Sequence, residues 1–424
     1  MDDRILLIIP TSAYSTGEFM AAATGLGIQV VVASDRRQVM ESVFPGGSLA
    51  LDFSDAEKAV AQIVEHARRW PLRACIGIDD YGSLLAAMAC EALGIPHGST
   101  TAVRAAGNKL LLRRALADAG VRSAEFRLLS VDADPRLEAM PTRYPCVLKP
   151  VFLSASRGVI RADDEEAFAR AFTRIKALLA DPSVAGPRVS GRGREASRQI
   201  LVEEYIPGFE VALEGLLTAG ELRVLALFDK PDPLEGPYFA ETLYITPSAL
   251  SIERQKEIAA TVTAAARAIG LREGPVHAEL RINESGVFVV ECAARSIGGV
   301  CSRVLRFGVG VSLEELVLRH ALGMPVAGQV ADQEEEEAGG VMMLPVPRRG
   351  VLREVRGQDG ARLVAHIEEV VISIPPNTQV EPLPEGDRYL GFMFARGGSA
   401  EIVEKALRQA FRQLEVVIDA PARE

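Results

Sequence analysis

A pair of glutamates in the stretch 275–299, PVHAELRINESGVFVVECAARSIGG, has the spacing to do chemistry together. The stretch reads as two strands joined by a three-residue connection, Glu284 to Gly286, in which glycine suits a left-handed turn. Centring the hairpin on this connection puts Glu279 directly opposite Glu291. Carboxylates that face each other across a strand pair repel, so a cation lying between them would explain the pair.

Alternation along both strands divides this hairpin into a polar and an apolar face, and the same register puts His277 opposite Ala293. The polar face carries His277, Glu279, Arg281, Glu291 and Arg295. The apolar face carries Val276, Ala278, Leu280, Ile282, Phe288, Val290, Cys292 and Ala294. From the hairpin alone two interpretations stay open: a metal ion held between the glutamates, or an amphipathic hairpin whose arginines offset the acids.

The composition narrows the class of protein. A length of 424 residues predicts two or three domains, and the net charge of −10 without a dense basic patch argues against a nucleic-acid partner. No apolar run is long enough for a bilayer, and the N-terminal MDDRILLIIP has acids where a signal peptide has bases. The five cysteines show no zinc, redox or disulfide spacing. We therefore expect a cytoplasmic protein without a membrane partner.

Strands and helices alternate at the start of the chain. Strands are predicted at 4–10, 28–33 and 74–78, and helices at 18–27 and 62–70. This rhythm is typical of a small parallel sheet with helices on both faces. The first strand is followed by PTSAYSTG instead of G-x-G-x-x-G, so the residues give no direct support for nicotinamide binding.

Two lysines stand next to segments that could approach a phosphate. A helix that starts near Asn108 carries Lys109, and a strand ends at Lys149 before the small-residue loop 154–158. Small side chains let the backbone N–H groups of that loop come close to phosphate oxygens, and Arg157 adds a cation. The plain alternatives are a solvated lysine at a helix start and a lysine snorkelling from an ordinary hairpin.

Irregular segments divide the rest of the chain. Residues 181–197, rich in Gly, Pro, Ser and Arg, predict a mobile surface loop that could act as a lid. The Pro-rich stretch 228–248 offers polar candidates for a substrate pocket: Asp229, Lys230, Glu235, Glu241 and Tyr244. The acidic run 334–337 indicates a junction before a terminal α+β module, which ends in a helix at 399–414 and a strand.

Four pieces thus follow one another in order: Lys109 on a helix, Lys149 before a small-residue loop, the segment EEYIPGFE at 203–210, and the glutamate pair. In this order they resemble the ATP-grasp superfamily over roughly residues 72–323. The strand ECAARSIGG is similar to the form found in carboxylate–amine ligases of the L-amino-acid ligase branch. The resemblance implies an ATP-grasp fold that combines α/β and α+β parts.

The resemblance also divides the chain into domains. It implies an N-terminal Rossmann-like pre-ATP-grasp domain at 1–104, an ATP-grasp domain at 105–325 with its small lobe at about 126–206, and a C-terminal α+β ligase-type module at 338–424. Within the last, the segment RYLGFMFARG at 388–397 is expected to border the active site.

Roles in ATP binding are carried over onto the matching residues. These are Lys109, Lys149, Ser154, Ser156, Arg157, Gly158, Glu203, Glu204, Tyr205, Ile206 and Glu210. The lysines would contact phosphates, the backbone of 204–206 would pair with the adenine edge, and Glu210 would hold the ribose hydroxyls.

Metal and substrate roles follow in the same way. Glu279 and Glu291 would bind Mg²⁺, with Mn²⁺ as an alternative, and Lys149 and Arg295 would act in catalysis. The residues expected at the substrates are Glu241, His277, Arg295, Gly298 and Gly299. Glu241 would face an incoming amine, although a solvated loop residue is an equally open interpretation.

The chain departs from the family pattern at two positions. Ala155 stands where many relatives have glycine, which we expect to stiffen the loop. Ala293 stands where many members have a metal-binding asparagine, so water would have to complete the magnesium shell and metal affinity would be weaker.

The activity implied is an ATP-dependent carboxylate–amine ligase. ATP would phosphorylate a carboxylate, and an amine would attack the acyl-phosphate to form an amide or peptide bond, releasing ADP and phosphate. Amino acids are the expected small-molecule substrates, and a homodimer is expected because relatives often dimerise. The alternatives are a biotin-carboxylase-like enzyme, whose E-I-N-P-R form is missing here, and a non-catalytic ATP-binding module.

Overall fold

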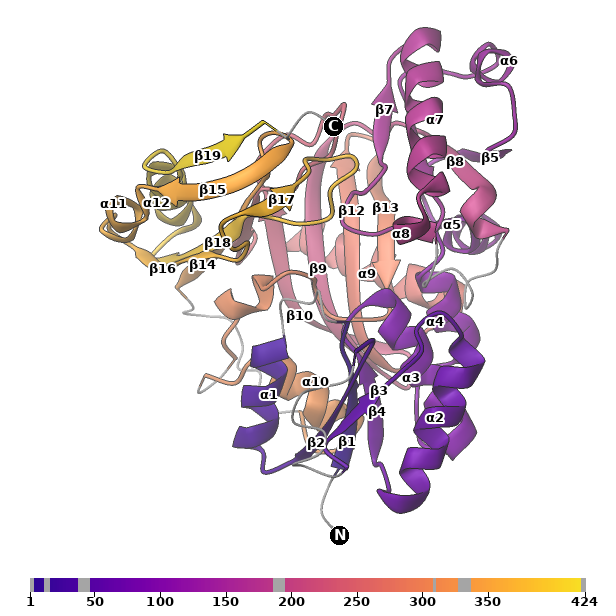
Figure 1. The fold of residues 1–424 in the computed structure, drawn as a ribbon, viewed down its shortest axis with the longest axis vertical. Helices are drawn as coiled ribbons and strands as arrows, with labels where there is room; N and C mark the ends of the chain where they lie inside the picture. Colours follow the sequence, from indigo (N-terminus) through magenta and orange to yellow (C-terminus); the bar gives the residue numbers. More distant parts are fainter. Residues whose placement is uncertain are drawn as a thin grey trace.

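The computed structural model describes residues 4–10, 16–36, 46–185, 195–307, 310–326 and 337–420. In Figure 1 the N-terminal part lies below the large sheet and the small lobe at the upper right, and the C-terminal strands at the upper left include three that belong to the large sheet. Residues 186–194 of the predicted mobile loop and 334–336 of the predicted junction lie outside the described residues. Among those described, no helix combines the length and apolarity needed to cross a membrane.

The N-terminal part confirms the predicted parallel sheet with helices on both faces. Alternate side chains of the central strand point to opposite layers: Ile5 and Leu7 pack with α1 (Thr16–Gly25), and Leu6 and Ile8 with the helices of the other face. That other face is covered by α2 (Ala56–Arg69) and α3 (Asp80–Leu93). The strand order β3-β2-β1-β4 comprises Ser48–Ala50, Gln29–Ser34, Arg4–Ile8 and Ala74–Gly77. The short β3 was not predicted.

The small lobe is an antiparallel sheet backed by one long amphipathic helix. In the order β5-β8-β6-β7 its strands are Phe126–Ser130, Gln199–Glu204, Cys146–Pro150 and Ile160–Ala162. Phe168, Phe172 and Ile175 of α7 (Glu165–Ala180) pack on this sheet, their spacing matching the helical repeat. The short helices are α4 (Thr100–Ala106), α5 (Lys109–Asp118), α6 (Pro135–Ala139) and α8 (Pro182–Ala185).

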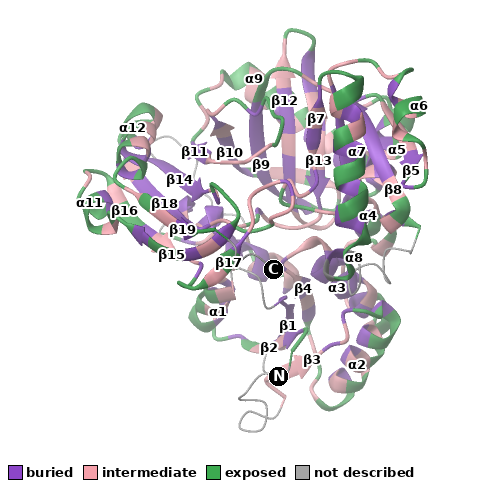
Figure 2. Cartoon of the chain, turned by 45° about the horizontal axis from the view of Figure 1, so that its top comes forward, coloured by how far each residue is buried: buried purple, intermediate pink, exposed green. Residues whose placement is uncertain are grey.

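The large sheet has eight strands, all paired antiparallel, in the order β13-β12-β9-β10-β11-β14-β18-β16. The strands β9 to β13 are Phe209–Thr218, Glu221–Lys230, Leu243–Thr246, Gly274–Asn283 and Gly286–Ala293; β14, β16 and β18 are Ala338–Leu344, Ile367–Ile372 and Gly391–Gly397. Figure 2 shows that β9 is largely buried, whereas β12 is buried mainly along the middle of its length. The sheet therefore runs through residues on both sides of the predicted junction.

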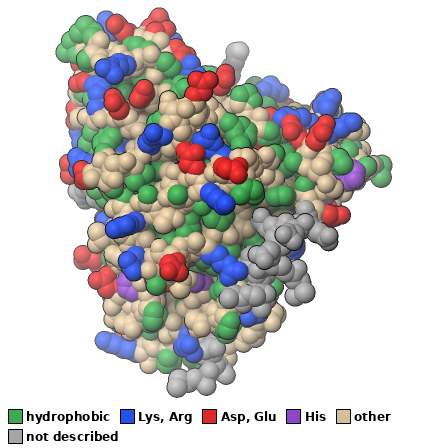
Figure 3. Space-filling view, turned by 180° about the vertical axis from the view of Figure 1, so that it is seen from behind, with side chains coloured by type: hydrophobic (Ala, Val, Ile, Leu, Met, Phe, Trp, Pro, Cys, Tyr) green, Lys and Arg blue, Asp and Glu red, His purple; other side chains and the backbone are tan. Residues whose placement is uncertain are grey.

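Helices and a small third sheet complete the fold. The helix α9 (Ile252–Ile269) covers the apolar face of β12, and α10 (Leu313–Ala321) packs between the N-terminal part and the large sheet. The third sheet, β17-β15-β19, is made of Thr378–Val380, Gly350–Arg356 and Glu415–Asp419, with α11 (Gln358–Arg362) and α12 (Ala400–Phe411) nearby. On the face seen in Figure 3, acidic and basic side chains are interspersed instead of forming a basic patch.

The hairpin of β12 and β13 confirms the predicted pairing of Glu279 with Glu291 and of His277 with Ala293. Its loop, however, has two residues where three were predicted, because Asn283 pairs directly with Gly286. The shorter loop would put the pairs out of step by one residue. A β-bulge next to Glu279 restores the predicted register.

Between the loop and the bulge, the predicted faces of β13 are wrong. Val287 and Val289 enter the core, whereas Phe288 and Val290 are only half-buried. The bulge is the reason: Val290 has no partner in the ladder, so the alternation reverses on its two sides. The prediction for Cys292, beyond the bulge, is confirmed by its complete burial.

Candidate active site

One cavity of about 350 Å³ lies where all parts of the chain meet. It is lined by Asp79 and Asp80 of the N-terminal part, by both lobes of the middle part, and by Asp387, Arg388 and Tyr389 near the C-terminus. Every site residue predicted from the sequence lines this cavity except Gly158. The predicted residues, although far apart in the chain, therefore lie around one cavity, and Arg388 and Tyr389 of the segment 388–397 lie there too.

A buried cationic cluster forms one end of the cavity. The Arg113 guanidinium, which is 1 % exposed, lies 2.7 Å from the Glu203 carboxylate and donates to the Val290 carbonyl at 2.8 Å. Lys149 forms an ion pair with the same carboxylate. Glu203 was predicted to touch ATP, but here its carboxylate binds these two cations.

Arg113 was not predicted from the sequence, although a signal was present. It stands four residues after Lys109 on α5, and therefore on the same side of the helix. Its neighbours Leu112 and Leu116 are buried, so a charged residue in this apolar pattern needs a partner within the fold. That partner, Glu203, is ninety positions away in the sequence.

The cationic cluster carries more positive than negative charge. Burial, with a smaller contribution from the nearby Arg113 and Lys109, lowers the pKa of Lys149 to about 8 against the opposing effect of Glu203. One carboxylate thus faces several cations in a site screened from water. Lys109 also donates from Nζ to the Leu153 carbonyl at 2.5 Å, which points it along the small-residue loop. Such a cluster favours polyanions.

The small-residue loop is tied to the C-terminal part of the chain. Arg157 donates from Nε to the Glu385 carbonyl at 2.8 Å, and the Gly158 N–H donates to the Pro384 carbonyl at 2.8 Å. Ala155 and Ser156 both adopt positive φ values, 55° and 54°. Each of these left-handed conformations costs on the order of 1 kcal/mol, so the contacts around the loop must stabilise it. The stiffening effect of Ala155 stays a prediction.

The segment 204–206 lies on the cavity wall with part of its backbone already engaged. The N–H groups of Glu204 and Tyr205 donate to Glu125 and Pro145, and the Ile206 carbonyl accepts from Arg281. Pairing with an adenine edge would therefore have to use the remaining backbone groups.

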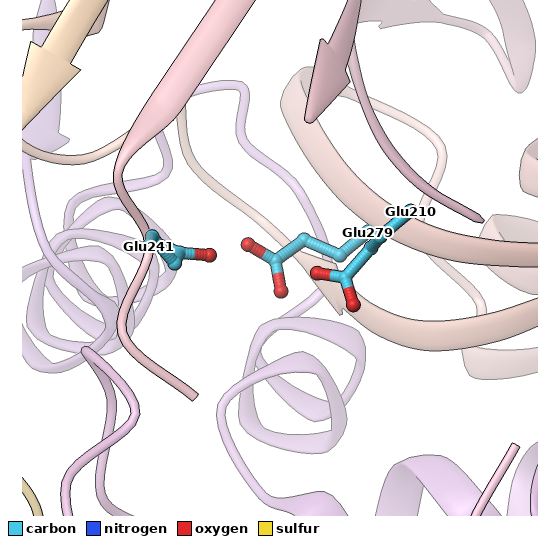
Figure 4. A group of neighbouring side chains, drawn as sticks. All are labelled: Glu210, Glu241 and Glu279. Carbon is cyan, nitrogen blue, oxygen red and sulfur yellow. The ribbon is translucent and has the colours of Figure 1, made fainter. Parts of the chain in front are cut away.

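A lysine occupies the centre of a carboxylate cluster in the middle of the cavity. The oxygens of Glu210, Glu241 and Glu279 lie within 4.8 Å of one another, and Figure 4 shows the three side chains converging. The Lys230 Nζ lies 2.8, 2.7 and 3.0 Å from these three carboxylates and is 3 % exposed. The ammonium thus takes the place that a metal ion would need among them.

The charges in this cluster depend on one another. Burial opposes the charged form of Lys230, but Glu210, Glu241 and Glu279 hold its pKa well above the usual value. Burial raises the pKa of Glu241 to about 7, whereas Lys230 and His277 hold the pKa of Glu279 well below its usual value against the effect of burial. Glu210 has both oxygens in ion pairs, with Lys230 and with Arg281 at 2.8 Å, so a ribose would have to share them.

His277, predicted at the substrate, is buried with both ring nitrogens facing carboxylates. Nδ1 pairs with Glu214, and Nε2 lies 3.6 Å from Glu279. Burial alone would lower the pKa of His277, but the Glu214 carboxylate raises it to about 10. The imidazolium therefore orients Glu279 from the cavity wall.

Glu214 was missed from the sequence. Its carboxylate also accepts the Ile297 backbone N–H at 3.0 Å, which fixes the turn that follows β13. Glu210 and Glu214 share one face of β9 because they are four residues apart, and both are buried on an otherwise apolar strand. Two acidic residues on the same face of an apolar strand were the sequence signal that could have identified Glu214.

Arg295 links the glutamate hairpin to the N-terminal part of the chain. Its Nε donates to Asp80 at 2.8 Å, and its Nη2 lies 3.6 Å from Glu291. Burial opposes the charged form, but Asp80 and Glu291 keep the pKa of Arg295 above its usual value. Asp80 begins α3 directly after β4, so the N-terminal domain positions this guanidinium.

The glutamate pair could hold a divalent cation at the cavity wall. Within the described residues, the Glu291 carboxylate accepts no hydrogen bond, and its nearest cation is Arg295 at 3.6 Å. Glu279 lies opposite in the ladder, and carboxylate oxygens are the donors that Mg²⁺ prefers. Ala293 is buried opposite His277 and offers no side-chain oxygen. Weaker metal affinity on that account stays a prediction.

Gly298 and Gly299 lie on the cavity wall next to the C-terminal part. Gly299 has a φ of +63°, and a Cβ there would lie 3.3 Å from a ring carbon of Phe392. Glycine is therefore suited to this turn by conformation and by space.

Comparison with known proteins identifies the family. The family model of the ATP-grasp domain matches residues 142–304. The chain belongs to the ATP-grasp superfamily. The ATP-grasp N-terminal domain matches residues 20–97, and the L-amino acid ligase C-terminal domain 2 matches residues 342–419. These matches confirm the resemblance to the L-amino-acid ligase branch, while the outer domain boundaries stay predictions.

Individual ATP-grasp relatives agree with this assignment. A solved L-amino acid ligase from Bacillus licheniformis is 25 % identical, with a TM-score of 0.83 and 99 % of each chain covered, which confirms the predicted fold. Alanine–anticapsin ligase from Bacillus subtilis (strain 168) is 29 % identical over 62 % of this chain and 56 % of its own length. Carnosine synthase 1 from Gallus gallus is 26 % identical over 86 % of this chain and 40 % of its own length. The chain thus spans about half the length of these curated relatives.

Proposed function

We propose that this chain is an ATP-dependent ligase that joins a carboxylate to an amine through an acyl-phosphate, releasing ADP and phosphate. The observation that carries the proposal is a single cavity that combines a surplus of buried cations at one end with the paired Glu279 and Glu291 and the anchored Arg295. The related amino-acid ligases make amino acids the favoured substrates for both roles.

The residues divide the reaction among them. Arg113 and Lys149 hold the phosphates of ATP, and Glu279 with Glu291 would hold Mg²⁺, or Mn²⁺ in its place. When bound, the metal neutralises charge on the phosphoryl oxygens. Arg295, fixed by Asp80, stabilises the negative charge of the acyl-phosphate, and Glu241 faces the incoming amine.

Formation of ADP tests the proposal. A matrix of amino acids offered in pairs, read by phosphate release and product mass, is expected to show ADP formation that needs both an acid and an amine. Activity that needs bicarbonate and biotin, or no turnover with any pair, would overturn it. The homodimer and the cytoplasmic location stay predictions, which light scattering and cell fractionation would test.

The affinity for ATP is expected to fall as the pH rises above about 8, where Lys149 of the free protein loses its proton. The phosphates of ATP favour the charged form of Lys149, so ATP binding above that pH requires the uptake of a proton. The Kd for ATP therefore rises by up to about tenfold per pH unit. Calorimetric titration with a non-hydrolysable ATP analogue between pH 7 and 9 measures this. In Lys149→Met the affinity should be weaker and independent of pH over this range; an unchanged slope would contradict the role of Lys149.

A further inference from the structure

Arg388 differs from the other arginines of the cavity. Five arginines line it, and four of them, Arg113, Arg157, Arg281 and Arg295, have a carboxylate partner. Arg388 is exposed and forms no ion pair or hydrogen bond with the described part of the chain. Its neighbour Asp387 faces Arg157 at 3.4 Å. The cavity therefore has one guanidinium whose charge no protein group balances among the described residues.

The fold brings Arg388 to the amine side of the cavity. Three neighbouring strand ends meet there: Thr242 accepts from the Met343 N–H at 2.7 Å, and Leu344 accepts from the Leu390 N–H at 2.8 Å. Adjacent strands are about 4.8 Å apart, so the chain at Glu241 and the chain at Leu390 lie on the order of 10 Å apart. Both side chains line the cavity, so one small molecule bound there can contact both.

Tyr389 supports this proximity. Burial raises the pKa of the Tyr389 hydroxyl well above its usual value, and the Glu241 carboxylate raises it further. The backbone of Glu241 lies within hydrogen-bonding reach of the same hydroxyl. The residue beside Arg388 is thus in contact with Glu241, and both line the cavity.

We propose that Arg388 binds the carboxylate of the amino acid that serves as the amine, while the amino group of that substrate faces Glu241. This inference rests on the proposed ligase function. A zwitterion presents its two charges a few bonds apart, and the exposed Arg388 guanidinium and the partly buried Glu241 carboxylate are opposite to them in sign. Arginine suits a carboxylate because it donates two parallel hydrogen bonds. The product would be a peptide whose C-terminal carboxylate stays at Arg388.

Steady-state kinetics with two amine donors of the same side chain test this. One donor is the free amino acid, and the other is its amide, which lacks the negative charge. The wild-type protein is expected to show a lower KM for the free acid. In Arg388→Gln the KM for the free acid should rise about 10- to 100-fold, while the KM for the amide and for ATP stay within twofold.

The matched control is Arg353→Gln, an exposed arginine of the same domain that pairs with Asp419 and does not line the cavity. It should leave both KM values unchanged. An equal effect of Arg388→Gln on acid and amide, no effect on either, or a rise confined to the KM for ATP would overturn the inference while leaving ligation intact. If the wild-type protein released no ADP in response to any amine, the proposed function itself would be overturned.

Discussion

Glu291→Gln is expected to lower the rate of ADP release by about 10²- to 10³-fold without destabilising the protein. The amide keeps the shape of the side chain but removes the negative charge that we propose binds the metal ion. The 3.6 Å contact with Arg295 is too long for a strong ion pair, and Arg295 keeps Asp80 at 2.8 Å, so the fold loses little. Coupled-enzyme detection of ADP at several Mg²⁺ concentrations measures the loss.

Glu284→Gln is the matched control because Glu284 lies exposed in the loop of the same hairpin. It should keep at least about half of the wild-type rate, since a change at an exposed loop residue rarely affects structure. Retention of such a rate by Glu291→Gln would contradict the metal role, and a large fall in melting temperature would show that the charge serves stability instead.

Lys230→Met is expected to lower the free energy of unfolding by about 3–5 kcal/mol, because it leaves one buried and two partly buried carboxylates without their cation. The carboxylates would then be more stable protonated, so their pKa values in the folded state would rise above those of the unfolded chain. Their protonation stabilises the variant at low pH, and that stabilisation is lost as the pH rises. Urea unfolding should therefore show a larger deficit at pH 8 than at pH 5.

Lys58→Met provides the comparison for Lys230. Lys58 forms an ion pair with Asp52 at 2.9 Å, but its side chain is 60 % exposed, so its removal should leave the midpoint of urea unfolding almost unchanged. Lys230→Arg keeps the charge and should recover part of the stability. A deficit in Lys230→Met no larger than that of Lys58→Met would show that the carboxylates are neutralised in another way.

The sequence predicted the local order of the site well. Lys109, Lys149 and the glutamate pair each follow from a short pattern, and alternation along the strands placed Glu279 opposite Glu291. The loop length and the bulge could not be read separately, because their effects on the register cancel at this pair. Only the burial of Val287 and Val289 distinguishes a two-residue loop with a bulge from a three-residue loop without one.

The partners of buried charges were harder to predict. Arg113 and Glu203 belong to different elements, and nothing near either residue indicates the other. Lys230 was named only as a polar candidate, since its role appears when β10 places it beside Glu210 and the hairpin brings Glu279 next to it. The partner of a buried charge depends on which elements pack together. The residue pattern along a single helix or strand does not contain that information.

The continuous eight-stranded sheet has a consequence for exchanging parts between ligases. The C-terminal module adds β14 to the edge of β11, and Leu243 to Thr246 would otherwise present bare backbone N–H and C=O groups. An unpaired edge of this kind invites association with other chains. A chimaera designed to acquire another enzyme's amine specificity should therefore be joined inside a loop that preserves the β11–β14 ladder. The exchanged module supplies strand pairing to the large sheet as well as any recognition residues.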